Sequence, residues 1–140
     1  MFENLNWIAI GISTLVSMGI GAAWYSSLAK PWIAANGFTD AQVKSIEAND
    51  TPLIYVIAAI CHLVMAVILS GVVFHAGGDE VTLGDGVLTA FLIWLGFVLT
   101  TMCVNHRFQF KTWVLTVIDS GHYLIVLLAQ GAILGWFGFA

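Results

Sequence analysis

Residues 53–74 read LIYVIAAICHLVMAVILSGVVF, an apolar run that contains no Asp, Glu, Lys or Arg. An α-helix rises about 1.5 Å per residue, so roughly 20 such residues cross the ~30 Å hydrocarbon core of a bilayer. The run is continuous rather than alternating, which is typical of a membrane helix and not of a barrel strand. It therefore predicts a transmembrane helix.

Three further runs have the same character and contain neither Lys nor Arg: residues 7–28, 83–104 and 112–137. Each is long enough to cross a bilayer as a helix. The sequence thus predicts an all-α, polytopic integral membrane protein, with residues 1–140 forming one domain. We expect its four transmembrane helices to pack as a bundle.

The composition excludes several other classes of protein. Hydrophobic residues make up 60% of the 140 and charged residues only 9%, whereas a soluble domain has about 25% charged residues. A formal charge of -4 with only four Lys and Arg excludes a nucleic-acid binder. Cys61 and Cys103 lie inside apolar runs, which argues against a disulfide scaffold.

The segment between the first two spans contains a helix signal. Thr39 and Gln42 have the spacing of a capping box, in which each side chain accepts a hydrogen bond from the other residue's free backbone N–H. We therefore expect a short amphipathic surface helix over about residues 39–48. Val43 and Ile46 would face the bilayer or the bundle.

The positions of the cations predict the orientation in the membrane. Lys30 and Lys44 lie between spans one and two, and Arg107 and Lys111 lie between spans three and four. Loops rich in Lys and Arg stay in the cytoplasm. We therefore expect a multi-pass protein of the cell inner (plasma) membrane, with the first and third loops cytoplasmic and both termini outside.

Small residues predict where the helices meet, because helices in lipid associate through close backbone approach. They recur at every fourth position in span one and form a GxxxG pattern near the end of span four, and one glycine follows Trp94 closely in span three. Such contacts would form within one chain or between copies. The expected packing residues are Ser13, Ser17, Gly21, Gly96, Gly131 and Gly135.

A row of polar residues in span four is the strongest candidate for a functional site. Asp119 lies roughly 10 Å inside the cytoplasmic start of the span, and helical spacing places His122 or Tyr123 and Gln130 near the same face. A carboxylate at such depth costs about 2.5–3.5 kcal/mol on insertion scales, so it needs a partner or a proton. His62 in span two lies at a similar depth to His122.

Two interpretations of this cluster remain open. The residues would contact a proton, an ion or a substrate, or they would only form hydrogen bonds that fix the packing. A transition metal is least favoured, because neither cysteine completes a ligand set. Known catalytic motifs are absent, so we expect no enzyme, no metal and no cofactor. His75 and His106 lie at loop edges, where we expect them to be solvated.

Short motifs follow one another along the whole chain in a specific order: Asn6-Trp7, Gly21-x-x-Trp24-Tyr25-Ser26, Lys30-Pro31-Trp32, Asn36-Gly37-Phe38-Thr39, Trp94-Leu95-Gly96-Phe97, Thr100-Thr101, Asn105, Asp119-x-Gly121-His122-Tyr123 and Gly131-Ala132-Ile133-Leu134-Gly135. In this order they resemble the bacterial membrane family known as domain of unknown function 1761. The resemblance implies four helices and a chain of about this length. It implies no particular activity.

Two functions from different classes follow from these observations. The first is a homo-oligomeric transporter or channel for a proton, an ion or a small solute, because four short helices enclose little volume alone. The second is a membrane scaffold or accessory subunit that binds another membrane protein or lipid. In both cases we expect membrane lipid as a partner and no nucleic acid.

Overall fold

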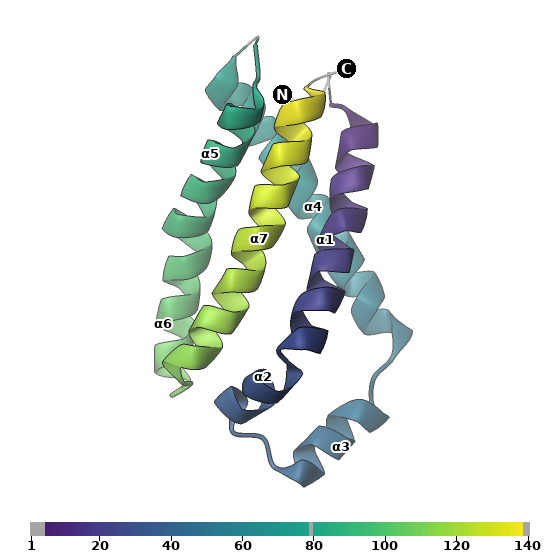
Figure 1. The fold of residues 1–140 in the computed structure, drawn as a ribbon, viewed down its shortest axis with the longest axis vertical. Coiled ribbons are helices and arrows are strands. Elements are labelled where there is room, and N and C mark those ends of the chain that lie inside the picture. Colours follow the sequence, from purple (N-terminus) through teal and green to yellow (C-terminus); the bar gives the residue numbers. More distant parts are fainter. Residues whose placement is uncertain (1–4, 79, 139–140) are drawn as a thin grey trace.

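A computed structural model of the chain describes residues 5–78 and 80–138, and these residues form helices and no strand. In Figure 1 the long helical segments lie side by side, and short helices lie at one end. In chain order the elements are α1 (Trp7–Ser27), α2 (Ala29–Asn36), α3 (Asp40–Ala48), α4 (Pro52–Gly77), α5 (Leu83–Ile93), the π-helical segment η1 (Trp94–Leu99), α6 (Thr100–Phe108) and α7 (Trp113–Phe137).

Four helical segments of the described chain are long and apolar enough to cross a membrane, which confirms the all-helical part of the predicted fold class and agrees with four spans. They are Trp7–Ser27, Pro52–Gly77, Leu83–Phe108 and Trp113–Phe137. Pro52 occupies the first turn of α4, where its missing N–H costs little. The third segment continues to Phe108, a full turn beyond the predicted end at residue 104. This extension affects the site described below.

The ends of the chain and the connections between helices lie at two opposite ends of the molecule (Figure 1). The start of α1, the end of α7 and the α4–α5 connection share one end, which we call the terminal end. The helices α2 and α3 and the turn between α6 and α7 share the other, which we call the α3 end. All four Lys and Arg residues belong to elements at the α3 end.

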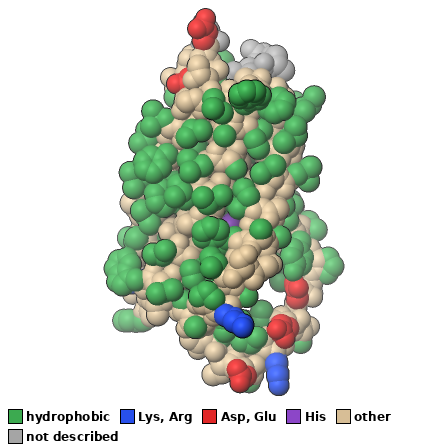
Figure 2. All heavy atoms as spheres, in the orientation of Figure 1, with side chains coloured by type: hydrophobic (Ala, Val, Ile, Leu, Met, Phe, Trp, Pro, Cys, Tyr) green, Lys and Arg blue, Asp and Glu red, His purple; other side chains and the backbone are tan. Residues whose placement is uncertain are grey.

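Large hydrophobic side chains cover the outside of the four long segments. Leu15 on α1 is 74% exposed, Phe97 on η1 is 72% exposed and Val117 on α7 is 68% exposed. Figure 2 shows hydrophobic side chains over most of the visible face, with charged ones near the two ends. Apolar surface on this scale is unfavourable in water and favourable against lipid tails.

The apolar core lies in the half of the molecule nearest the terminal end. It gathers buried side chains from α1, α4, α5 and α7, including Ala9, Ile10, Leu69, Ala90 and Leu134. Asp119 and its hydrogen-bonding partners, described below, occupy the other half, toward the α3 end. The two halves are thus held together in different ways.

Glycines let α5 and α7 approach until their backbones touch. A Cβ added at Gly131 would clash with the backbone carbonyl oxygen of Gly86, and one added at Gly135 would lie 2.5 Å from the carbonyl oxygen of Thr82. A real Cβ does not come that close to a carbonyl. The GxxxG pattern of α7 therefore packs against α5 within the same chain, and α5–α7 is the most extensive helix pair.

The other expected packing residues divide into two groups. Ser13 and Ser17 of α1 are fully buried, and a Cβ added at Gly21 would come within 3.3 Å of Nε2 of His122. Gly96, in contrast, is exposed, and no atom of another helix lies within 4 Å of the place a Cβ would take. Within the described chain Gly96 therefore packs against no other helix, and its expected role in packing stays a prediction for contacts between copies.

Capping boxes start two of the helices. At α3, the hydroxyl of Thr39 accepts a hydrogen bond from the backbone N–H of Gln42, and the Gln42 side chain accepts one from the backbone of Thr39, as predicted. Thr82 and Asp85 form the same arrangement at α5. Asp85 therefore caps the N-terminus of α5, where it accepts a hydrogen bond from a free backbone N–H, and it lies outside the buried polar region.

Candidate functional site

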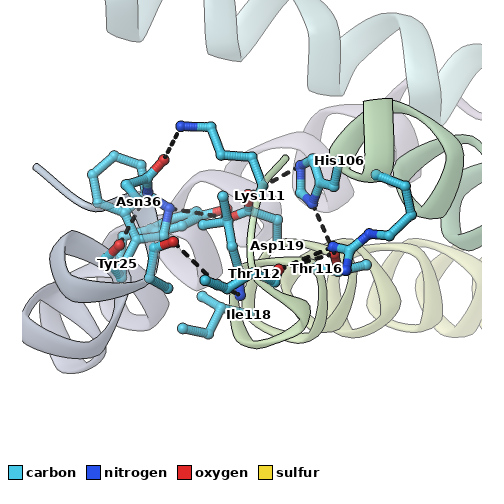
Figure 3. A network of polar contacts seen from close by, with 12 residues as sticks. Tyr25, Asn36, His106, Lys111, Thr112, Thr116, Ile118 and Asp119 are labelled. Carbon is cyan, nitrogen blue, oxygen red and sulfur yellow. Dashed lines mark hydrogen bonds and ion pairs between the residues drawn. The ribbon is translucent and has the colours of Figure 1, made fainter. Parts of the chain in front are cut away.

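The carboxylate of Asp119 accepts hydrogen bonds from two other helices. Asp119 lies in the second turn of α7. The hydroxyl of Tyr25, on α1, donates to Oδ1 over 3.0 Å (Figure 3), and the indole Nε1 of Trp32, on α2, donates to the same oxygen over 3.1 Å. Hydrogen bonds to an ionised acceptor are stronger than neutral ones, so these two donors stabilise the carboxylate where water is scarce.

The other carboxylate oxygen faces His106. Nε2 of His106 lies 3.8 Å from Oδ2 of Asp119, and Nδ1 lies 3.0 Å from the hydroxyl of Thr116 (Figure 3). The His106 side chain is only 15% exposed, so the expectation that it is solvated is wrong. The reason is that α6 continues to Phe108 and directs His106 back against α7.

Two cations hold the α6–α7 turn in place beside this carboxylate. Arg107 donates to the backbone carbonyl of Thr112 and, over 2.8 Å, to the hydroxyl of Thr116, and its guanidinium lies 3.7 Å above the ring of Trp113. Nζ of Lys111 lies 3.5 Å from the side-chain oxygen of Asn36 on α2. None of these bonds involves Asp119, so the cations position the turn rather than neutralise the carboxylate.

Two tryptophans fix α7 on either side of Asp119. The indole of Trp24, on α1, donates to the carbonyl of Ile118 over 3.0 Å, and the indole of Trp94, in η1, donates to the carbonyl of Ser120 over 2.7 Å. Gly121 leaves room for this approach, because a Cβ there would come within 3.1 Å of the Trp24 ring. The depth and rotation of Asp119 are thus set from two neighbouring helices.

A pair of histidines lies deeper in the molecule. The ring centroids of His62, on α4, and His122, on α7, are 6.2 Å apart. His122 is 4% exposed, and neither of its ring nitrogens has a hydrogen-bond partner in the described chain; Nδ1 of buried His62 also has none. Buried polar atoms are normally hydrogen-bonded, so a side chain with two such nitrogens is unusual and suggests a functional role.

Tyr25 connects the histidine pair to the carboxylate. Its hydroxyl donates to Asp119, and its ring centroid lies 5.0 Å from that of His122. These side chains therefore follow one another in a column, joined by polar contacts as far as Tyr25 and by ring contacts beyond it. Ordered from the α3 end inward, they are His106, Asp119, Tyr25, His122 and His62. We call these five residues the polar column.

Gln130 and Tyr123 lie at the edges of the polar column. The amide of Gln130 is fully buried and donates to the hydroxyl of Ser17 over 3.0 Å and to the backbone carbonyl of His62 over 3.2 Å. The Tyr123 ring packs 4.8 Å from that of His122 and lines an apolar groove of about 530 Å³ between α4 and the η1–α6 segment. Ile68, Phe97 and Met102 are among the other residues that line this groove.

The structure thus brings the five predicted site residues into one region, but not into one direct contact network. His62, His122 and Tyr123 are neighbours, Gln130 bonds to the backbone of His62, and Asp119 reaches the others only through Tyr25. In residues 5–78 and 80–138, no three His, Cys, Asp or Glu side chains converge to hold a metal ion.

Sequence reasoning missed three partners of the carboxylate: Tyr25, Trp32 and His106. The first two come from helices more than eighty residues away in the sequence. The sequence did contain a signal for Tyr25 and Trp32. An intramembrane carboxylate requires hydrogen-bond donors at its own depth, and each of these two residues carries a donor close to the end of the first span.

The fold and the site define a class of protein. It is all-helical, its four apolar segments can cross a membrane, and between the helices lie a carboxylate with its hydrogen-bond donors and a pair of histidines. The chain belongs to the family described as protein of unknown function (DUF1761), whose sequence model matches residues 8–135. This assignment confirms the resemblance found from the sequence motifs. No curated protein and no solved structure matches the chain.

Proposed function

We propose that this chain is a small transporter of the bacterial inner membrane that moves a proton, an ion or a small solute along the polar column. The supporting observation is the buried His122, whose two ring nitrogens have no partner in the described chain while its ring contacts both His62 and Tyr25. Maintaining such groups at membrane depth is costly, and ionisable residues kept there usually serve binding or proton transfer.

The cations at the α3 end support an orientation for this transporter. Lys30, Lys44, Arg107 and Lys111 all belong to this end, and Lys and Arg are retained on the cytoplasmic side of a membrane. In our proposal the four spans form a bundle, α3 lies as an amphipathic helix at the cytoplasmic surface, and both termini are outside. Asp119 and His106 would then be the first groups of the polar column that a proton from the cytoplasm meets.

The terminal half supports a role for more than one copy. Glycine packing of α5 on α7 and the apolar core fill most of that half, and among the described residues no buried histidine or acidic side chain continues the polar column beyond His62. We propose that copies associate and complete the pathway at their interface. The mass of the protein in detergent, measured by light scattering, tests this; a monomer that retains full flux would contradict it.

Proton flux into proteoliposomes tests the proposed function. Purified protein is reconstituted with an internal pH dye, and a potassium gradient with valinomycin drives proton entry. We expect flux above that of empty vesicles, and Asp119→Asn and His122→Gln should each lower it at least about tenfold. His75→Gln, which changes an exposed histidine near the terminal end, is the matched control and should retain the flux.

Wild-type protein that carries no flux, or flux that survives loss of Asp119, His62 and His122 together, would contradict the proposal. The alternative is then a scaffold or accessory subunit. The apolar groove beside Tyr123 favours that alternative, because it opens between α4 and α6 where a lipid chain or a partner helix would fit. Narrowing it with Val98→Phe should then weaken binding of the partner and leave the fold intact.

A further inference from the structure

A second cavity, separate from the apolar groove, lies at the α3 end. Its volume is about 790 Å³, and its walls come from the end of α1, from α2 and α3, and from the first turn of α4. Figure 2 shows a hollow at this end of the molecule with acidic side chains near its rim. The volume lies within the range of about 300–1,000 Å³ that is usual for sites binding small molecules.

Aromatic rings form much of the wall of this cavity. Tyr25, Trp32, Phe38 and Tyr55 all line it. Tyr25 and Trp32 meet edge to face, with centroids 6.1 Å apart and planes at 81°, and Trp32 and Phe38 meet at 5.7 Å and 66°. Rings set at steep angles to one another form the corner of a box, which is the arrangement that holds an organic cation against aromatic faces.

The charged side chains in the wall are both acidic. Glu47 and Asp50 line the cavity, and no Lys or Arg does. Asp50 accepts a hydrogen bond of 2.9 Å from the hydroxyl of Tyr55, which fixes one of its oxygens. The ion pairs formed by the described residues include neither of these two acids. The cavity therefore combines two acidic side chains that have no ion-pair partner among the described residues with apolar and aromatic surface. Lys111 does not line the cavity, but its Nζ lies 5.7 Å from the centroid of the Phe38 ring.

The inner wall connects this cavity to the polar column. Tyr25 and Trp32 line it, and the same two side chains donate hydrogen bonds to Oδ1 of Asp119. A molecule packed against these rings would therefore be separated from the carboxylate by one layer of side chains. Binding of such a molecule would shift Tyr25 or Trp32 and so change the hydrogen bonds that Asp119 accepts.

We propose that this cavity binds an organic cation with an aromatic or apolar body, and that such cations are the substrate class of the transporter. This inference rests on the proposed function and specifies its solute. The acids select positive charge, the rings accept the cation and its apolar body, and Val43, Ile46 and Ile54 complete an apolar floor. The position at one end of the spans suits molecules that collect at a membrane surface.

Equilibrium binding of tetraphenylphosphonium to the purified protein in detergent tests the inference. This probe has a permanent positive charge and an aromatic body, and tetraphenylborate has nearly the same shape with a negative charge. We expect saturable binding of the phosphonium and none of the borate. Glu47→Gln and Asp50→Asn should each weaken binding at least about fivefold, and the double variant should abolish it.

Asp40→Asn is the matched control, because it removes one acidic charge from the same helix without touching the cavity. It should bind as the wild type does. Absence of saturable binding, equal binding of both probes, or unchanged affinity in the double variant would each overturn the inference. The substituted acids are exposed, so these variants should fold, and helicity by circular dichroism checks this.

A lipid headgroup with an ammonium could supply the same chemistry, so binding is repeated in nanodiscs made of phosphatidylglycerol alone and with phosphatidylethanolamine. Equal affinity in both supports a free solute. Loss of phosphonium binding in the second assigns the cavity to the headgroup and overturns the inference. Binding without flux would overturn the proposed function and, with it, the assignment of these cations as substrates, leaving only the binding site. Proton flux without binding would overturn only the inference.

Discussion

The two halves of this molecule are held together by different interactions. Toward the terminal end, α5 and α7 touch backbone to backbone through Gly86, Gly131 and Gly135, and apolar side chains fill the remaining space. Toward the α3 end the helices are separated by longer polar side chains, and Asp119 is reached from α1, α2 and α6 by Tyr25, Trp32 and His106.

This difference separates the part that stabilises the fold from the part available for function. Dispersion between close backbones is strong and leaves no room for water or a ligand. Polar contacts over a wider spacing leave room for the cavity near α3, and three histidine nitrogens there have no hydrogen-bond partner in the described chain. The comparison predicts that substitutions at the two ends will have different effects, given below from the largest to the smallest.

The largest effect is expected where the two backbones touch. Gly131→Leu places a side chain against the carbonyl of Gly86, which cannot move away, and should cost at least about 3 kcal/mol of unfolding free energy. The protein should lose its monodisperse peak in size-exclusion chromatography in detergent. Gly96→Leu is the control, since open space surrounds that position. If both variants behave alike, the glycine contact is not what holds the terminal half.

A smaller loss is expected at the carboxylate. Asp119→Ala leaves Tyr25 and Trp32 as half-buried donors without an acceptor, at a cost of about 1–3 kcal/mol. Asp119→Asn keeps an acceptor oxygen and should cost only about 1 kcal/mol. Thermal unfolding in one detergent compares the two variants with the wild type. Equal melting temperatures for Ala and Asn would mean that the two hydrogen bonds contribute nothing to stability.

The indole of Trp94 lies between the two halves and should have an intermediate effect. Trp94→Phe removes the hydrogen bond to the Ser120 carbonyl but keeps an aromatic ring, so we expect a loss of about 1 kcal/mol. Trp136→Phe, at a position that is 75% exposed, should cost nothing measurable. The same thermal assay applies, and a larger loss at Trp136 would contradict the placement of its ring on the outer surface.

The smallest global effect is expected in the cap of α3. Thr39→Ala removes the capping hydrogen bond and should destabilise this helix by about 1 kcal/mol without shifting the unfolding of the four long segments. Hydrogen exchange should accelerate in residues 40–48 only. Ser45→Ala, at an exposed position of the same helix, is the control. Faster exchange throughout the chain would mean that α3 is part of the main cooperative unit.

The fold was largely predictable because the bilayer imposes a length on each apolar run. The ends of the four segments lie within four residues of the predicted ends, and the third span deviates most, reaching Phe108 instead of residue 104. Hydropathy falls at Asn105, His106 and Arg107, but backbone hydrogen bonding does not depend on hydropathy, so α6 continues through them. Capping boxes were readable because they depend on residues only three positions apart.

The site was predictable only in part, because periodicity describes a single helix. It placed Asp119, His122 and Gln130 near one face of α7, and depth in the membrane related His62 to His122. Neither argument gives the rotation of one helix against another. Tyr25 and Trp32 were therefore not found as donors to the carboxylate, and Gly96 was not recognised as a residue that faces away from the other helices of its own chain.

The π-helical segment η1, residues Trp94–Leu99, has a consequence for everything that follows it in the third span. A π-turn accommodates one residue more than an α-turn does, which rotates the rest of the helix by roughly 100° about its own axis. His106 and Arg107 lie beyond this offset, and their contacts with α7 depend on it. The six residues of η1 thus set the direction in which His106 and Arg107 point, although these side chains lie almost two turns further along the helix. Deleting one residue from η1 would turn both side chains away from α7.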